Sequence, residues 1–121
     1  MAEHNETGKE GEAEASSYLA KHGFRILHRN WHYHHYELDI VAEKEGEVVV
    51  VEVKTRSSAY LLPPEEAVNA KKIKRIVVAA DAYIRFFNIS APVRFDIITL
   101  TKEKGYYKIE HIEDAFFAPI N

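Results

Sequence analysis

Hydrophobic residues recur with two different periods along the chain, and these periods predict which segments are helices and which are strands. Apolar positions three and four residues apart are typical of a helix with one buried face. Alternation, or a short apolar run between turn residues, is typical of a strand. We therefore expect helices at residues 7–22 and 69–88, and strands at 24–33, 36–43, 47–54, 93–101 and 106–112.

Residues 47–54, with the sequence EVVVVEVK, form the clearest predicted strand. Its four consecutive valines are apolar on both faces, which places it at the centre of a sheet. The second helix is also well marked, because Asn69 is a suitable N-cap and an apolar stripe follows it. The stripe consists of Ile73, Ile76, Val77, Ala80, Tyr83, Ile84 and Phe87.

Together these elements predict an α/β fold with a mixed central sheet flanked by helices, in the order αβββαββ. The first three strands are expected to form an antiparallel meander, and the long helix is expected to lead to a parallel strand. A chain of 121 residues is long enough for one domain, so we expect a single domain over residues 1–121 with a frayed start at 1–6. Residues 55–69 include Pro63-Pro64 and are expected to form a loop.

Composition narrows the classes of function. The chain contains no cysteine, which excludes disulfides, cysteine-bound metals and thiol catalysis. Its start is acidic and polar, and no apolar run is long enough to span a bilayer, so we expect a cytoplasmic protein without a membrane partner.

Charge is sorted into blocks, although the net charge of −3 argues against coating of nucleic acid by bulk positive charge. Residues 37–53 hold six acids and one lysine, and residues 54–94 hold eight basic residues and three acids. An acidic centre beside cationic segments suits a metal-dependent phosphodiester site. Ordinary clustering of surface charge produces the same pattern.

Two carboxylates are predicted to meet across the hairpin formed by the second and third strands. If its turn is centred on Glu45-Gly46, Asp39 lies opposite Glu52 and Glu37 lies opposite Lys54. Opposed side chains have Cβ atoms about 5 Å apart, so two acids placed in this way can share one hard cation such as Mg²⁺ or Mn²⁺. A three-residue turn would shift the register by one and separate the two acids.

The chemistry suited to such a pair is phosphodiester hydrolysis. Glu52 interrupts an apolar strand face and must be paired, hydrated or bound to metal, while Lys54 on the same face can position the attacking water. Glu12 lies at helical spacing from Ala15 and can approach the same centre. A simpler interpretation stays open, in which Glu52 and Lys54 form a structural ion pair and Glu12 and Glu37 are solvated.

Several segments spread over nearly the whole chain form one recognisable pattern. They are Gly11-Glu12, Asn30-Trp31, residues 37–42 (ELDIVA), residues 50–57 (VVEVKTRS), Glu66-Ala67-Val68, Lys72, Arg94-Phe95-Asp96 and residues 111–116 (HIEDAF). This pattern resembles the YraN-like uncharacterised bacterial family. That family looks like a small member of the restriction-endonuclease-like PD-(D/E)xK nucleases, similar in layout to archaeal Holliday junction resolvases.

The resemblance implies specific roles. Glu12 would be the acid of the first helix, Asp39 and Glu52 the ligands of Mg²⁺ or Mn²⁺, and Lys54 the catalytic lysine. The expected partner is nucleic acid, with DNA first, and branched and single-stranded DNA are among the candidate forms. The family usually has Gly-Glu-Ile-Asp where this chain has Tyr36-Glu37-Leu38-Asp39, so the approach to the acids is expected to differ in shape.

Basic residues and histidines near this centre are further candidates. Arg56 is expected to contact nucleic-acid phosphates because it follows the metal strand. Lys72 lies at a helix start, which favours anions, and the resemblance implies the same role for it because the family has a lysine at this position. Three other cations at this helix start fit a solvated face as well: Lys71, Lys74 and Arg75. The histidines at 32, 34 and 35 suit either a metal site or an ordinary surface.

Three functions therefore remain open at this point. The first is a metal-dependent endonuclease acting on DNA. The second is a nucleic-acid-binding module of a larger assembly that does not cut. The third is a scaffold in which the acids and Lys54 form a structural ion network. A two-fold homodimer would suit a symmetric junction, but the sequence does not demonstrate one.

Overall fold

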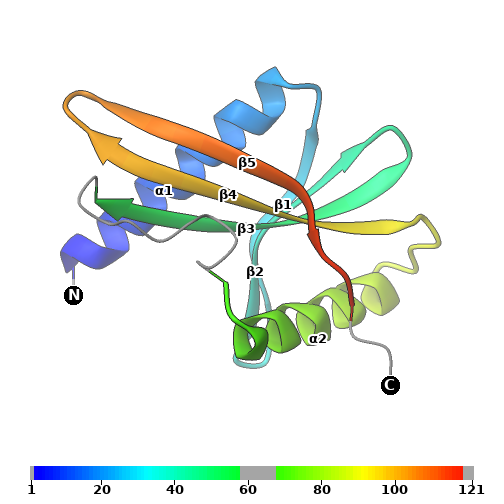
Figure 1. The fold of residues 1–121 in the computed structure, drawn as a ribbon. Coiled ribbons are helices and arrows are strands. Elements are labelled where there is room, and N and C mark those ends of the chain that lie inside the picture. Colours follow the sequence, from blue (N-terminus) through cyan, green and yellow to red (C-terminus); the bar gives the residue numbers. More distant parts are fainter. Residues whose placement is uncertain (1, 58–67, 119–121) are drawn as a thin grey trace.

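Five strands form one mixed sheet, and a helix packs against each of its faces (Figure 1). The computed structural model describes residues 2–57 and 68–118. In chain order the elements are α1 (Ala2–Lys21), β1 (Arg25–Tyr33), β2 (Tyr36–Lys44), β3 (Glu47–Ser57), α2 (Ala70–Phe86), β4 (Val93–Glu103) and β5 (Tyr106–Phe116). The αβββαββ order and the α/β class predicted from the sequence are confirmed.

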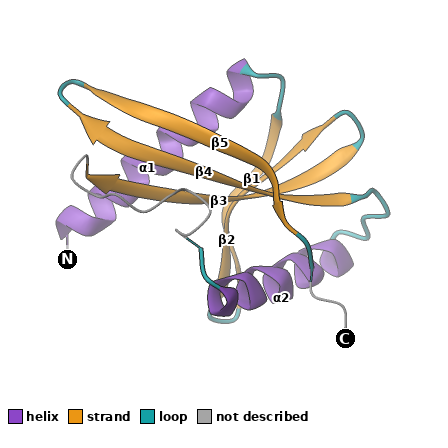
Figure 2. Ribbon diagram, in the orientation of Figure 1, coloured by secondary structure: helices purple, strands orange, loops and turns teal. Residues whose placement is uncertain are grey.

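The strands pair in the order β1-β2-β3-β4-β5, and every neighbouring pair is antiparallel except β3 and β4. These two are parallel because α2 carries the chain back to the end where β3 began (Figure 2). The β2–β3 hairpin turns through Glu45 and Gly46, whose φ angles of 52° and 81° are those of a two-residue type I′ turn. The predicted register is therefore confirmed next to the turn, from Lys44↔Glu47 to Ile40↔Val51.

The valine run of β3 supplies both halves of the core. Val48 packs in the cluster that contains Tyr83 of α2, and Val49 packs in the cluster that contains Leu19 of α1. The next two valines repeat this alternation. Each buried valine contributes about 1.5–3 kcal/mol, so the run holds a helix to each face of the sheet.

Strand β3 is longer than the sequence predicts. It continues to Ser57, although the sequence assigns residues 55–57 to a loop, because β4 pairs with it as far as Ser57↔Lys102. Pairing with a neighbouring strand here overrides the weak strand propensity of this stretch. Residues 68 and 69 lie in neither a helix nor a strand, as predicted, and residues 58–67 of the predicted loop lie outside the described residues.

The helix boundaries also differ from expectation. Helix α1 begins at Ala2 instead of Thr7, since acidic residues near a helix start favour the helical state. Helix α2 ends at Phe86, two residues before Asn88, which adopts a left-handed φ of 53° that ends helical geometry. Neither helix is both long and apolar enough, within the described ranges, to pass through a lipid bilayer.

A fully buried carboxylate, Asp96, ties the last strand to β4. It accepts hydrogen bonds from the Arg94 guanidinium at 2.9 and 2.8 Å and from the Asp114 amide at 2.9 Å, and His111 Nε2 lies 2.7 Å from it. Asp114 has a φ of 54° and lies where the β4–β5 register shifts, so Asp96 stabilises a bulge in β5.

Candidate acidic site at the strand fork

The sheet divides partway along β2 and β3. Their antiparallel pairing ends at Ile40↔Val51, yet β2 continues beside β1 as far as Tyr36, and β3 continues beside β4 to its own end. Figure 1 shows the two strands diverging beyond this point. We call the place where they part the strand fork, defined by Asp39 on β2 and by residues 52 and 53 on β3.

Asp39 and Glu52 are the first residues of their strands beyond the last pair. Asp39 Oδ2 accepts a hydrogen bond of 2.9 Å from the Val53 amide. The carboxylate thus satisfies a backbone donor that the strand ladder no longer pairs. The two acids lie in contact, as the register predicts, although a side chain rather than the β2 backbone makes the connection to β3.

The acid Glu52 is almost completely buried, with 7% of its surface exposed. Burial, and after it the neighbouring Asp39 carboxylate, raises the pKa of Glu52 to about 8, while Lys72 acts in the opposite direction. At neutral pH the pair therefore holds a proton or needs a further positive charge. Two acids that cannot both ionise unaided are well suited to hold a cation.

Glu12 approaches the fork from α1. Burial raises its pKa, and Asp39 raises it further, whereas a hydrogen bond with the Asn30 side chain lowers it. Gly11 makes this approach possible, because a Cβ atom at that position would overlap the Thr55 hydroxyl on β3. The absence of a side chain at Gly11 lets α1 lie against the sheet directly beside Glu12.

Asn30 is a site residue to which sequence reasoning assigns no role. It adopts a φ of 53°, a conformation that asparagine tolerates better than most residues, and its side chain bonds to Glu12. An asparagine inside a run of strand-forming residues is a signal of irregular backbone. That signal indicates a distortion of β1, but it does not indicate which acid lies nearby.

Lys54 is exposed and lies on the same face of β3 as Glu52. The predicted pairing of Glu37 with Lys54 is wrong: Glu37 Oε2 lies 3.2 Å from His32 Nε2, and the β2–β3 pairs stop before these positions. The fork separates the two strands too early for this contact. Lys54 is thus exposed to solvent, two residues beyond Glu52 on the same strand face.

The two predicted phosphate contacts occupy different positions. Arg56 is half-buried on β3, two residues beyond Lys54. Lys72 lies in the first turn of α2, and its Nζ is 3.4 Å from Glu52 Oε2. The predicted N-cap is confirmed, since Asn69 Oδ1 accepts a bond of 2.9 Å from the Lys72 amide. Lys72 therefore contributes directly to the charge balance of the acid pair.

The donor set of this site fits a hard divalent cation. Mg²⁺ is commonly held by one or two carboxylates with water in the remaining positions. Asp39 keeps an oxygen that does not bond to the Val53 amide, and Glu52 requires a compensating charge. Over the ranges 2–57 and 68–118, no three His, Cys, Asp or Glu side chains gather into a metal-binding group, so of the two interpretations left open for the histidines at 32, 34 and 35 the ordinary surface is the one that this part of the structure supports.

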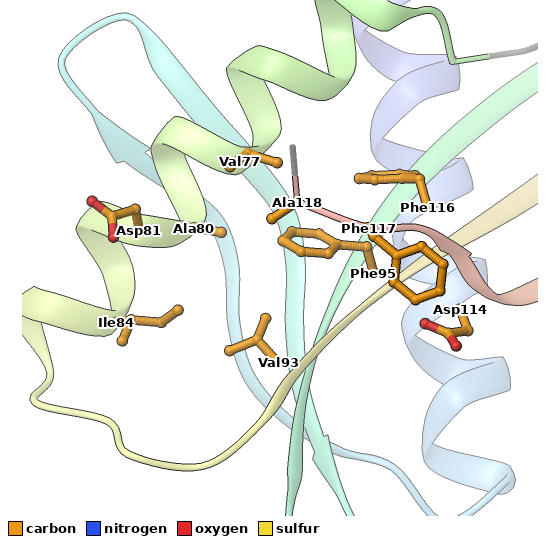
Figure 3. Close-up of a pocket in the computed structure, with 10 residues that line it drawn as sticks. All are labelled: Val77, Ala80, Asp81, Ile84, Val93, Phe95, Asp114, Phe116, Phe117 and Ala118. Carbon is orange, nitrogen blue, oxygen red and sulfur yellow. The ribbon is translucent and has the colours of Figure 1, made fainter. Parts of the chain in front are cut away.

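The apolar pocket drawn in Figure 3 lies away from these acids. It has a volume of about 230 Å³ between α2 and the ends of β4 and β5, and Val77, Phe95 and Phe116 are among the side chains that line it. Asp81 and Asp114 stand at its rim. It contains none of the predicted site residues, and its apolar lining does not suit a phosphate.

Fold and site together define a class: a small mixed α/β protein with a buried carboxylate pair at a strand fork. The sequence profile of Uncharacterised protein family UPF0102 matches residues 11–100 of the chain. The chain belongs to this family, and the matched region includes the fork, Gly11 and most of both helices.

Relatives from several bacteria are similar over almost the whole chain. A UPF0102 protein of Parabacteroides distasonis is 65% identical, over 98% of each chain. UPF0102 proteins of Bacteroides thetaiotaomicron, at 59% identity over 99% of each chain, and of Flavobacterium johnsoniae, at 47% identity over 97% of this chain and 98% of the relative, are similar as well. Their names record the family and state no activity.

Proposed function

We propose that this protein is a metal-dependent endonuclease that hydrolyses DNA phosphodiester bonds at the strand fork. The observation that carries the proposal is the burial of Glu52 against Asp39, in a pair of acids that cannot both ionise without a further positive charge such as a divalent cation. The resemblance of the Asp39, Glu52 and Lys54 pattern to restriction-endonuclease-like enzymes supports the same chemistry.

Each side chain has a role in this proposal. Asp39 and Glu52 would hold Mg²⁺ or Mn²⁺, which when bound stabilises negative charge on phosphoryl oxygens. Lys54, exposed on the same face of β3 as Glu52, orients the attacking water and stabilises the hydroxide that forms when the proton of that water passes to solvent. Glu12 lies on the α1 side, where it can accept a hydrogen bond from that water or from a solvating neighbour.

Recognition would depend on the DNA backbone. The net charge of −3 gives no general attraction for nucleic acid, so binding would rely on local cations, among them Arg56 and the basic start of α2. Contacts between cations and phosphates depend on the shape of the DNA backbone and not on its base sequence, which is consistent with a branched or single-stranded substrate. Cutting both strands of a symmetric junction would require two copies of the chain.

The test is incubation of the purified protein with Mn²⁺ or Mg²⁺ and a panel of duplex, single-stranded and junction DNAs. Asp39→Asn and Lys54→Met are expected to lose about 100-fold or more of the cleavage rate. Asparagine can still accept the Val53 hydrogen bond, so Asp39→Asn should remain folded. Asp81→Asn and Lys21→Met, which alter exposed residues of the same types, should cleave normally.

Two other results would each point to a different function. DNA binding without cleavage in either metal would indicate a binding module. Absence of both binding and metal uptake, together with strong destabilisation of Glu52→Ala, would indicate that the acids form a structural ion network.

A further inference from the structure

Lys72 is the cation that contacts the acid pair in this structure. Its Nζ lies 3.4 Å from Glu52 Oε2, and the two side chains differ greatly in exposure, 44% for Lys72 and 9% for Glu52. The lysine reaches in from solvent while the acid is fixed in the sheet. Lys72 can therefore leave the contact without repacking of the core, whereas Glu52 cannot.

The backbone of Lys72 is held independently of this ion pair. Its amide donates to the Asn69 side chain at 2.9 Å, which anchors the first turn of α2. Departure of the ammonium group would thus be a rotation of one flexible side chain, with the helix start left in place.

The position of Lys72 is otherwise unfavourable for a cation. A helix N-terminus carries partial positive charge, and the first turn of α2 contains no acidic residue. Lys71, Lys74 and Arg75 add further positive charge at the same end. Within the described part of the chain, the ion pair that the structure gives for Lys72 is the one with Glu52.

We infer that Lys72 occupies the cation position of the acid pair while no metal is bound, and that a divalent metal displaces it and frees its ammonium group for the phosphate of the DNA. This inference rests on the proposed function and specifies how the same site is regulated. A divalent cation takes the place of the ammonium group beside Glu52, so a positive charge faces this buried acid before and after the exchange.

Such an exchange couples metal and DNA binding. Lys72 competes with the metal for Glu52, which weakens metal binding in the free protein. A phosphate that binds the released ammonium removes the competitor and thereby strengthens metal binding. By linkage, the metal strengthens DNA binding by the same factor.

The first test measures Mn²⁺ affinity of the full chain by isothermal titration calorimetry. Lys72→Met should bind Mn²⁺ about fivefold or more tightly than the original protein, because no ammonium group must leave. Lys72→Gln, a neutral side chain that can still bond to Glu52, should show an intermediate gain and serves if Lys72→Met fails to fold. Lys71→Met and Lys74→Met remove neighbouring cations that do not contact Glu52, and should change the affinity less than about twofold.

The second test repeats the titration with a junction oligonucleotide present, in Lys54→Met protein that does not cleave. The oligonucleotide should tighten Mn²⁺ binding when Lys72 is present and should lose this effect in the Lys72→Met double variant. Equal or weaker Mn²⁺ binding by both Lys72 variants would overturn the exchange. Failure of the proposed function is distinct, because Asp39→Asn would then bind Mn²⁺ as well as the original protein.

Discussion

Glu52 is a residue whose protonation is coupled to folding. Its pKa is raised from 4.5 to about 8, chiefly by burial and next by Asp39. The folded state therefore favours the protonated form more than the unfolded chain does. The stability that this group contributes is fully present below about pH 4.5 and is lost as the pH rises through about 8.

Glu52→Gln removes this titration while keeping the size of the side chain. Without metal, raising the pH from 5 to 8.5 should lower the free energy of unfolding of the original protein relative to the variant by on the order of 3 kcal/mol. Urea unfolding at each pH, with a chelator present, measures the difference. Parallel pH profiles for the two proteins would show that Glu52 is not desolvated as the structure indicates.

The contact between Asp39 and Glu52 could be predicted from the sequence because the Glu45-Gly46 turn fixes the register of the hairpin. The contact between Lys72 and Glu52 could not, because it depends on how α2 crosses β3 after a connection that local patterns do not position. The partner of Glu37 could not be predicted either. The alternation of apolar and polar residues along a strand does not show where that strand stops pairing with its neighbour.

Among the elements, the contact between α1 and β3 is the one most sensitive to a single methyl group. Gly11→Ala should destabilise the protein by about 1–3 kcal/mol, since its Cβ would overlap the Thr55 hydroxyl. Gly8→Ala is the matched control: it lies in the same helix with no atom within 4 Å of its added Cβ. It should gain up to about 1 kcal/mol from helix propensity.

Thermal unfolding of both variants tests this contact. Thr55→Ala should recover part of the loss in the Gly11→Ala background, because it removes the overlapping oxygen. If Gly8→Ala and Gly11→Ala stabilise the protein equally, α1 does not approach β3 as closely as described.

Element types could be predicted well from the chain because the two periods of hydrophobicity are clear in the valine run of β3 and the apolar stripe of α2. The ends of the helices and strands could not be predicted in the same way. The last residues of β3 form a strand because β4 lies beside them, and the bulge in β5 depends on a buried bond from Asp96 to the Asp114 amide. Both depend on neighbours that are distant in sequence.

For the whole molecule, the Asp96 network joins three elements, since His111 also lies 3.3 Å from the Tyr18 hydroxyl of α1. Burial alone would raise the pKa of Asp96, but hydrogen bonds from His111, Arg94 and the Asp114 amide outweigh it and hold the pKa below its usual value. The stability that this carboxylate contributes is therefore present at neutral pH and is lost as the pH falls below about 4.

Asp96→Asn should lower the free energy of unfolding at pH 7 by about 3 kcal/mol, because it leaves Arg94 and its neighbours without their buried partner. Glu113→Gln removes an exposed partner of the same Arg94, 3.1 Å away, and should cost less than about 1 kcal/mol. Chemical denaturation of the two variants compares them directly. Equal losses would mean that Asp96 is no more important to folding than a surface ion pair.

The strand fork has one consequence for the molecule as a whole. Where two strands part, the Val53 amide bonds to the carboxylate of Asp39 instead of to a carbonyl. A carboxylate, unlike a carbonyl, gains and loses charge, so anything that binds Asp39 alters a hydrogen bond of the backbone itself. The Val53 amide is thus an internal reporter, and its NMR resonance should shift when a ligand binds the Asp39 carboxylate.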